Sequence, residues 1–102
     1  MKQPKLVRDF IPQIIQEDPE RTCDYYIADT EEYRQRLFDK MREELNEFIE
    51  EPSYEEAADM YEVFRAICLE FALSIDSVHN VAAEKRAQRG AFFDKIVLER
   101  VD

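Results

Sequence analysis

Apolar residues recur at three- and four-residue spacings over two neighbouring stretches of the chain, and this period predicts two amphipathic helices. The first covers about residues 31–50, and its apolar face carries Leu37, Met41, Leu45 and Phe48. The second runs from a capping box at Ser53 to about residue 73, with a wider apolar face formed by Ala57, Met60, Tyr61, Val63, Phe64, Ile67, Cys68 and Phe71. Only Pro52 and Ser53 separate the two helices, so we expect an antiparallel helical hairpin.

Shorter signals predict the elements around the hairpin. Pro12 is typical of a helix start, and Thr30 offers an N-cap for the first long helix. The run at 25–27 (Tyr-Tyr-Ile) resembles a short strand. A further helix is expected from about Asp76 to Gly90, the only glycine, which suits a position just past a helix end.

Composition supports an all-α fold, with the helical hairpin as its core and the further helix beside it. One glycine and four prolines are too few for the many tight turns of a β architecture. A length of 102 residues fits a single domain spanning 1–102, and one so small gains stability from packing against another copy. We therefore expect a homodimer or a larger homo-oligomer.

The net charge of −10 argues against unassisted binding to nucleic acid or to anionic membranes. An anionic substrate would need a metal ion or a local basic patch. No run approaches the roughly 20 apolar residues of a membrane span, and Met1–Arg8 lacks the apolar stretch of a signal peptide. A cytoplasmic protein is expected, with Cys23 and Cys68 as reduced thiols.

Acidic residues interrupt the apolar faces of the two hairpin helices. At 100° per residue, Glu44 falls beside Leu37 on the apolar face of the first helix, and Glu47 falls on its flank. Glu56 lies among the apolar positions of the second helix, with Asp59 at the edge. Each pair has i,i+3 spacing, and an antiparallel hairpin brings the four carboxylates level in two rungs.

Four ionised carboxylates on a half-buried patch repel one another and lose hydration, which a cation would compensate. A hard divalent ion with oxygen ligands fits, so the expected cofactor is Mg²⁺, with Mn²⁺ as a possible substitute. His79, the only histidine, belongs to no Glu-x-x-His motif of the kind that di-iron bundles use. Two other readings stay open: Glu56 as only a capping-box residue, and all four acids as the solvated surface of a non-catalytic helical interaction or dimerisation module. The neighbouring Glu43 and Glu50 are expected to point toward solvent.

Three segments of the sequence resemble one known family. Residues 43–47 (EELNE) followed by 56–59 (EAAD) are similar to the paired signature of the MazG-like all-α nucleoside triphosphate pyrophosphohydrolases. Residues 5–12 (KLVRDFIP) and 84–92 (EKRAQRGAF) resemble the opening and closing segments of its small phosphoribosyl-ATP pyrophosphohydrolase-like subgroup. Phe10 and Ala91 stand where the subgroup pattern has lysine and glycine.

This resemblance implies Mg²⁺-dependent hydrolysis of an NTP or dNTP to the monophosphate and pyrophosphate. The metal ligands would be Glu44, Glu47, Glu56 and Asp59, and Glu47 is the candidate to orient or deprotonate the attacking water. Candidates for holding the polyphosphate are the basic residues Lys5, Arg8, Lys85, Arg86 and Arg89. Lys85, Arg86 and Arg89 have an alternative reading, because cations near a helix C-terminus also offset the helix dipole.

Overall fold

Four helices and no strand are present in the computed structural model, which describes residues 4–102. In chain order they are α1 (Ile11–Gln16), α2 (Thr30–Glu50), α3 (Tyr54–Glu70) and α4 (Ile75–Arg89). The all-α expectation is confirmed. The expected strand at 25–27 is wrong: these residues are exposed, and no other extended segment pairs with them. Instead, the Tyr26 hydroxyl donates a hydrogen bond to Glu32 of α2.

Side-chain caps define where the hairpin helices begin. The Asp29 carboxylate accepts a hydrogen bond of 2.8 Å from the backbone N–H of Glu32, so Asp29 rather than Thr30 is the N-cap of α2. Ser53 Oγ accepts a bond of 3.2 Å from the backbone N–H of Glu56, as expected for the start of α3. These local bonds place the hairpin turn between Glu50 and Tyr54.

Positive φ angles mark the ends of α3 and α4. Helix α3 ends at Glu70, before the expected residue 73, and Ala72 has a φ of 59° in the left-handed region. Helix α4 begins after Ser74, whose hydroxyl accepts a 3.3 Å bond from the backbone N–H of Ser77. Gly90 ends it with φ 83° and ψ 176°, a conformation open to little but glycine.

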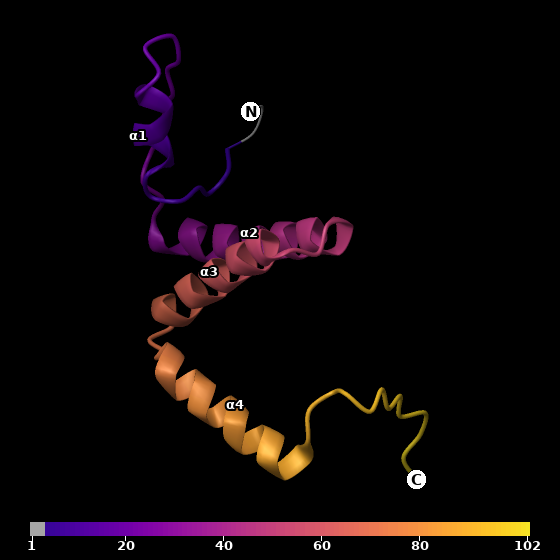
Figure 1. Cartoon of the computed structure of the whole chain (residues 1–102). Helices are drawn as coiled ribbons and strands as arrows, with labels where there is room; N and C mark the ends of the chain where they lie inside the picture. The colour runs from indigo at the N-terminus through magenta and orange to yellow at the C-terminus, as the bar shows by residue number, and fades with distance from the viewer. Residues whose placement is uncertain (1–3) are drawn as a thin grey trace.

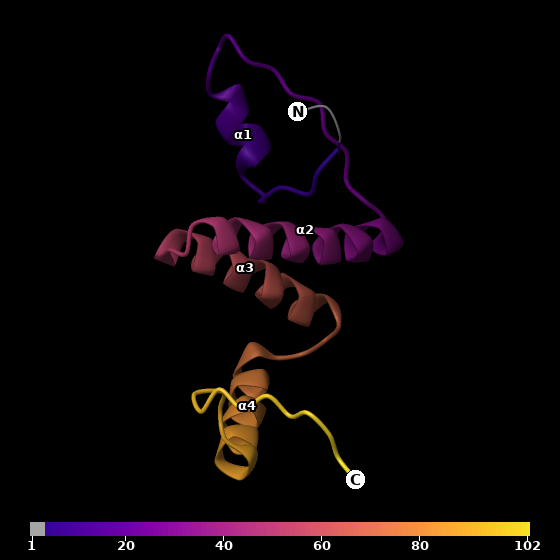
Figure 2. The ribbon, with the colours of Figure 1, turned by 90° about the vertical axis from the view of Figure 1, so that its right-hand side faces the viewer.

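The hairpin of α2 and α3 is the packed part of the chain. In Figures 1 and 2, α1 and the N-terminal segment lie on one side of α2, while α3 and then α4 lie on the other. Phe71 stacks on Phe38 with ring centroids 6.0 Å apart, and the Arg34 guanidinium lies 4.7 Å from the Phe71 centroid. Among the described residues, Leu37 and Cys68 are the only buried apolar side chains. The hairpin therefore has a narrow core.

None of the helices described in residues 4–102 is by itself long and apolar enough to cross a membrane. The pair of α3 and α4 passes that test of length and composition only when taken together, and the two are bent by 106° where they join.

A candidate metal site on the helical hairpin

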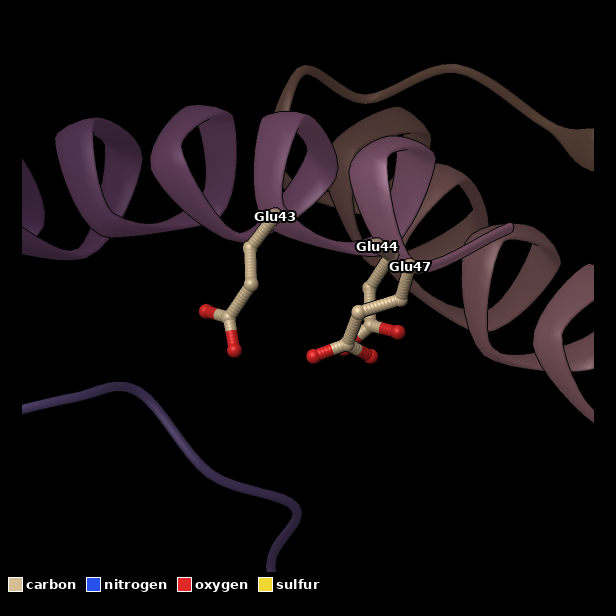
Figure 3. Close-up of side chains that lie close together, drawn as sticks. All are labelled: Glu43, Glu44 and Glu47. Atoms are coloured by element: carbon tan, nitrogen blue, oxygen red, sulfur yellow. The ribbon is translucent and has the colours of Figure 1, made fainter. Parts of the chain in front are cut away.

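Five carboxylates gather where α2 and α3 face each other near the closed end of the hairpin. They form two groups that share Glu44: one with Glu43 and Glu47, the other with Glu56 and Asp59. Within each group, one oxygen of every carboxylate lies within 4.8 Å of the others. Figure 3 shows Glu43, Glu44 and Glu47 projecting from the same side of α2. The structure thus brings together the four acids expected from the sequence, and adds Glu43.

Glu44 is the buried centre of this cluster, with 5% of its surface exposed. Its Oε1 lies 3.3 Å from Lys40 Nζ, whereas its buried Oε2 has no hydrogen-bond partner among the described residues. Burial raises the pKa of this carboxyl, and the charge of Glu47 raises it further, against the opposing effect of Lys40. A buried acid with one unpartnered oxygen is an unstable arrangement unless a cation compensates it.

Glu56 repeats this pattern from α3. Its Oε2 is also buried without a hydrogen-bond partner in the part of the chain that the structure describes. Loss of hydration raises its pKa, and the neighbouring charges of Asp59 and Glu44 add to the effect. The second group therefore contains two unpartnered oxygens from two different helices.

Three cations approach the cluster, two of them from the N-terminal segment. Lys5 Nζ lies 2.8 Å from Glu43 Oε1, and Arg8 Nη2 lies 2.7 Å from Asp59 Oδ1. The third, Lys40, lies 3.7 Å from Glu43. The Lys5 hydrogen bond lowers the pKa of Glu43, and the same bond raises the pKa of Lys5. Five acids against three cations leave two negative charges, which one divalent ion would balance.

The expectation that Glu43 points to solvent is wrong, because this side chain is partly buried and pairs with Lys5. Its helical position does turn it away from α3, but the N-terminal segment returns beside α2 and partly covers it. Lys5 and Glu43 are 38 positions apart in the sequence, so helical periodicity cannot predict their contact. Lys40 was missed as well, although its i,i+4 spacing from Glu44 is a usual signal for an ion pair.

A hollow of about 210 Å³ opens beside the cluster, between the N-terminal segment and α2. It is lined by Pro4, Lys5, Leu6, Arg36, Asp39, Lys40 and Glu43. The lining carries three cations and two acids, which leaves one net positive charge, and the cations Lys5 and Arg36 are paired with Glu43 and Glu32.

The three basic residues expected on the last helix lie elsewhere. Helix α4 contacts α3 but not α2, and Lys85, Arg86 and Arg89 are all exposed. No ion pair joins any of the three to another residue within 4–102. Within one chain, the structure therefore brings Lys5 and Arg8 to the carboxylates and leaves the other three expected cations apart from them.

All the protein ligands available at the site are carboxylate oxygens. No histidine or thiol takes part in either group, and the unpartnered oxygens of Glu44 and Glu56 are free to bind an ion. This donor set fits a hard divalent cation such as Mg²⁺ or Mn²⁺, and it does not suit a soft metal.

Comparison with known proteins adds no relative: no protein-family model, no curated protein and no solved structure matches this chain.

Proposed function

We propose that this chain is a Mg²⁺-dependent nucleoside triphosphate pyrophosphohydrolase of the MazG-like all-α type. The observation that carries the proposal is the pair of buried, unpartnered carboxylate oxygens on Glu44 and Glu56, two acids that adjacent helices bring into one group. Such oxygens are expensive to bury unless a cation binds them. The sequence resemblance to the paired acidic signature supports the choice of reaction.

The proposed ligands are Glu44, Glu47, Glu56 and Asp59. When bound, Mg²⁺ would neutralise phosphate charge and lower the pKa of a water molecule. Mg²⁺ usually retains several waters and shares its coordination with substrate phosphates, so a half-open carboxylate site suits it. Mn²⁺ is expected to substitute, since it accepts the same oxygen ligands.

The reaction adds one water across the anhydride between the α and β phosphates, and it yields a nucleoside monophosphate and pyrophosphate. Glu47 is the proposed base: it is exposed, unlike Glu44, and belongs to the same carboxylate group. Lys5 and Arg8 would exchange their carboxylate partners for phosphate oxygens, since both form ion pairs at the surface. The cationic hollow next to Glu43 would receive part of the polyphosphate.

The test is release of pyrophosphate from a panel of ribo-, deoxy- and modified nucleoside triphosphates, with Mg²⁺, with Mn²⁺ and with EDTA. We expect at least one nucleotide to give equal amounts of monophosphate and pyrophosphate with either metal, and none with EDTA. Release of inorganic phosphate with a diphosphate would indicate a different hydrolase. No monophosphate from any nucleotide would contradict the proposal.

A second candidate function is a non-catalytic helical interaction module. The favouring observation is the set of large apolar side chains that remain exposed on α3, among them Tyr61 and Phe64. In that case the acids only keep the chain soluble, and Glu44→Ala would leave both partner binding and the response to metal unchanged.

A further inference from the structure

The N-terminal segment, which we define as residues 4–9, lies over α2 without packing tightly against it. Leu6 is half-buried, whereas the other side chains of the segment are exposed. A hollow of about 210 Å³ separates part of the segment from the helix. In the part of the chain that the structure describes, three polar contacts join the segment to the hairpin: Lys5 with Glu43, Arg8 with Asp59, and Pro4 with Arg36.

Two of these three contacts end on the carboxylate cluster itself. Lys5 pairs with Glu43, and Arg8 Nη2 donates a hydrogen bond of 2.7 Å to Oδ1 of Asp59, one of the proposed metal ligands. Figure 3 shows the indigo trace of the segment opposite the carboxylate ends of the labelled side chains. A guanidinium on this oxygen takes up a lone pair that a metal ion would use, and its positive charge repels the ion. Arg8 and a divalent cation therefore compete for Asp59.

The third contact lies outside the cluster. Arg36 Nη1 donates a hydrogen bond of 3.0 Å to the backbone carbonyl oxygen of Pro4. The same guanidinium donates through Nε to Glu32, at 2.7 Å, and through Nη2 to the Tyr26 hydroxyl, at 3.4 Å. The planar fork of an arginine can hold several acceptors at once in fixed directions. The contact at Pro4 is therefore fixed by α2 and does not depend on what the carboxylates bind.

We propose that Arg36 is a positioning residue: it anchors the N-terminal segment on α2, so that Arg8 pairs with Asp59 until a metal ion displaces it and then stays beside the site. The part that concerns metal and substrate rests on the proposed function, whereas the anchoring does not. When the carboxylates bind a cation, Lys5 and Arg8 exchange their partners. The contact between Arg36 and Pro4 is the one that remains and keeps both cations near the phosphates.

Exposure decides which contact gives way. The side chains of Arg8 and Asp59 are 57% and 40% exposed, so their ion pair contributes little and yields to a divalent ion. The Arg36 side chain is 30% exposed and donates to three acceptors. The contact at Pro4 is therefore the fixed end of the segment, and the contact of Arg8 is the exchangeable end.

NMR relaxation of backbone amides tests the anchor without metal or nucleotide. The amides of Leu6 and Val7 should have order parameters of about 0.85 in the wild type and below about 0.6 in Arg36→Gln, because two exposed ion pairs do not fix a segment by themselves. The wild type should keep its high values with saturating Mg²⁺, since the anchor remains. Equal order parameters in the wild type and in Arg36→Gln would overturn the proposal.

Calorimetric titration with Mg²⁺, again without nucleotide, tests the competition at Asp59. Arg36→Gln should bind Mg²⁺ about two- to fivefold more tightly than the wild type, the range expected for the loss of one exposed ion pair. Its KM for the nucleotide should instead rise about tenfold, because the cations are no longer held beside the phosphates. General damage to the fold would weaken both, so the opposite signs identify positioning. Unchanged or weaker Mg²⁺ binding by Arg36→Gln would overturn the proposal.

A double variant shows whether Arg36 acts through Arg8. Arg8→Gln should tighten Mg²⁺ binding as much as Arg36→Gln does, since each frees Asp59. The combination of Arg8→Gln with Arg36→Gln should bind Mg²⁺ no more tightly than Arg8→Gln alone, because residues that act through one contact are not additive. Additive gains would contradict a shared route.

The matched control is Arg34→Gln, because Arg34 lies on the same helix and forms an ion pair of 2.8 Å with Glu70, away from the N-terminal segment. It should leave the Mg²⁺ affinity and the order parameters unchanged, and equal effects of the two variants would overturn the anchoring role. Arg36→Lys keeps a cation beside Glu32 but lacks the planar fork, so it should behave like Arg36→Gln. Rescue by lysine would mean that only the charge matters, which would also overturn the proposal.

The two measurements separate this inference from the proposed function, since neither uses nucleotide. A wild type that binds Mg²⁺ but releases no pyrophosphate would refute the proposed function, while the relaxation and the titration would still decide the role of Arg36. A wild type that binds no Mg²⁺ would overturn both the proposed function and the competition between Arg8 and the metal.

Discussion

Two regions of the chain have equally clear helix signals but differ in burial. One is the hairpin of α2 and α3, and the other runs from α4 to the C-terminus. Both have hydroxyl N-caps, from Ser53 and from Ser74. The hairpin packs two helices together and buries an acid, whereas every residue of α4 from Asn80 onward is exposed. Helix formation is thus decided locally, whereas burial requires a partner surface. In the hairpin that surface is the other helix, whereas α4 contacts only α3 among the helices described in residues 4–102.

The largest expected effect is on catalysis at the hairpin. Glu44→Gln should lower pyrophosphate release by at least about a hundredfold, since removing even a residue that only hydrogen-bonds to a metal ligand commonly costs about 10- to 100-fold. The measurement is steady-state kinetics with Mg²⁺. Glu50→Gln on the same helix is the control and should change the rate by less than about twofold, because Glu50 is exposed and outside both carboxylate groups. Equal rates for the two variants would mean that the buried Glu44 has no catalytic role that an exposed acid of the same helix lacks.

The next effect is metal-dependent stability. Mg²⁺ at about 100 times its dissociation constant should stabilise the wild type by about 2.7 kcal/mol, which thermal melting detects. Glu56→Ala should abolish this shift, because it removes an unpartnered ligand oxygen.

Ser53→Ala separates the two possible roles of Glu56. Loss of this cap should destabilise the protein by about 1 kcal/mol and leave the Mg²⁺ shift intact. If Glu56→Ala behaved in the same way as Ser53→Ala, Glu56 would only help to start α3, and the second carboxylate group would lose its role.

The smallest expected effect is on the stability of the metal-free protein and its dependence on pH. Burial raises the folded-state pKa of Glu44 above its ordinary value of 4.5, so ionisation of Glu44 at neutral pH destabilises the fold. With EDTA at pH 7, Glu44→Gln should therefore melt a few degrees higher than the wild type, which corresponds to about 1 kcal/mol in a chain of this size.

The sign of this difference follows from the raised pKa. As pH falls through the folded-state pKa of Glu44 toward 4.5, the wild type takes up a proton and regains stability, so the two melting temperatures converge. Glu84→Gln on the exposed α4 should show no such behaviour. A difference between Glu44→Gln and the wild type that grew on acidification would mean that the Glu44 carboxylate is already well compensated without metal.

Much of the fold follows from the sequence because its signals are local. The hairpin, the Ser53 cap, the helix start near Pro12 and the end at Gly90 all depend on residues within one or two turns of each other. Burial of Glu44 was also predicted, because the 100° rotation per residue fixes which face it shares with Leu37. The prediction of a strand at 25–27 is wrong because a strand depends on non-local contacts. It must pair with a second strand, and none lies beside these residues.

The sequence by itself therefore determined the helices, their antiparallel turn and the convergence of Glu44, Glu47, Glu56 and Asp59, because helical periodicity carries that information. Only the tertiary structure decided that the N-terminal segment lies over α2, bringing Lys5 to Glu43 and Arg8 to Asp59. It also decided that α4 lies apart from the carboxylates. These relations join residues far apart in the chain, and their geometry depends on how whole segments pack, which no local pattern of apolar and polar residues encodes.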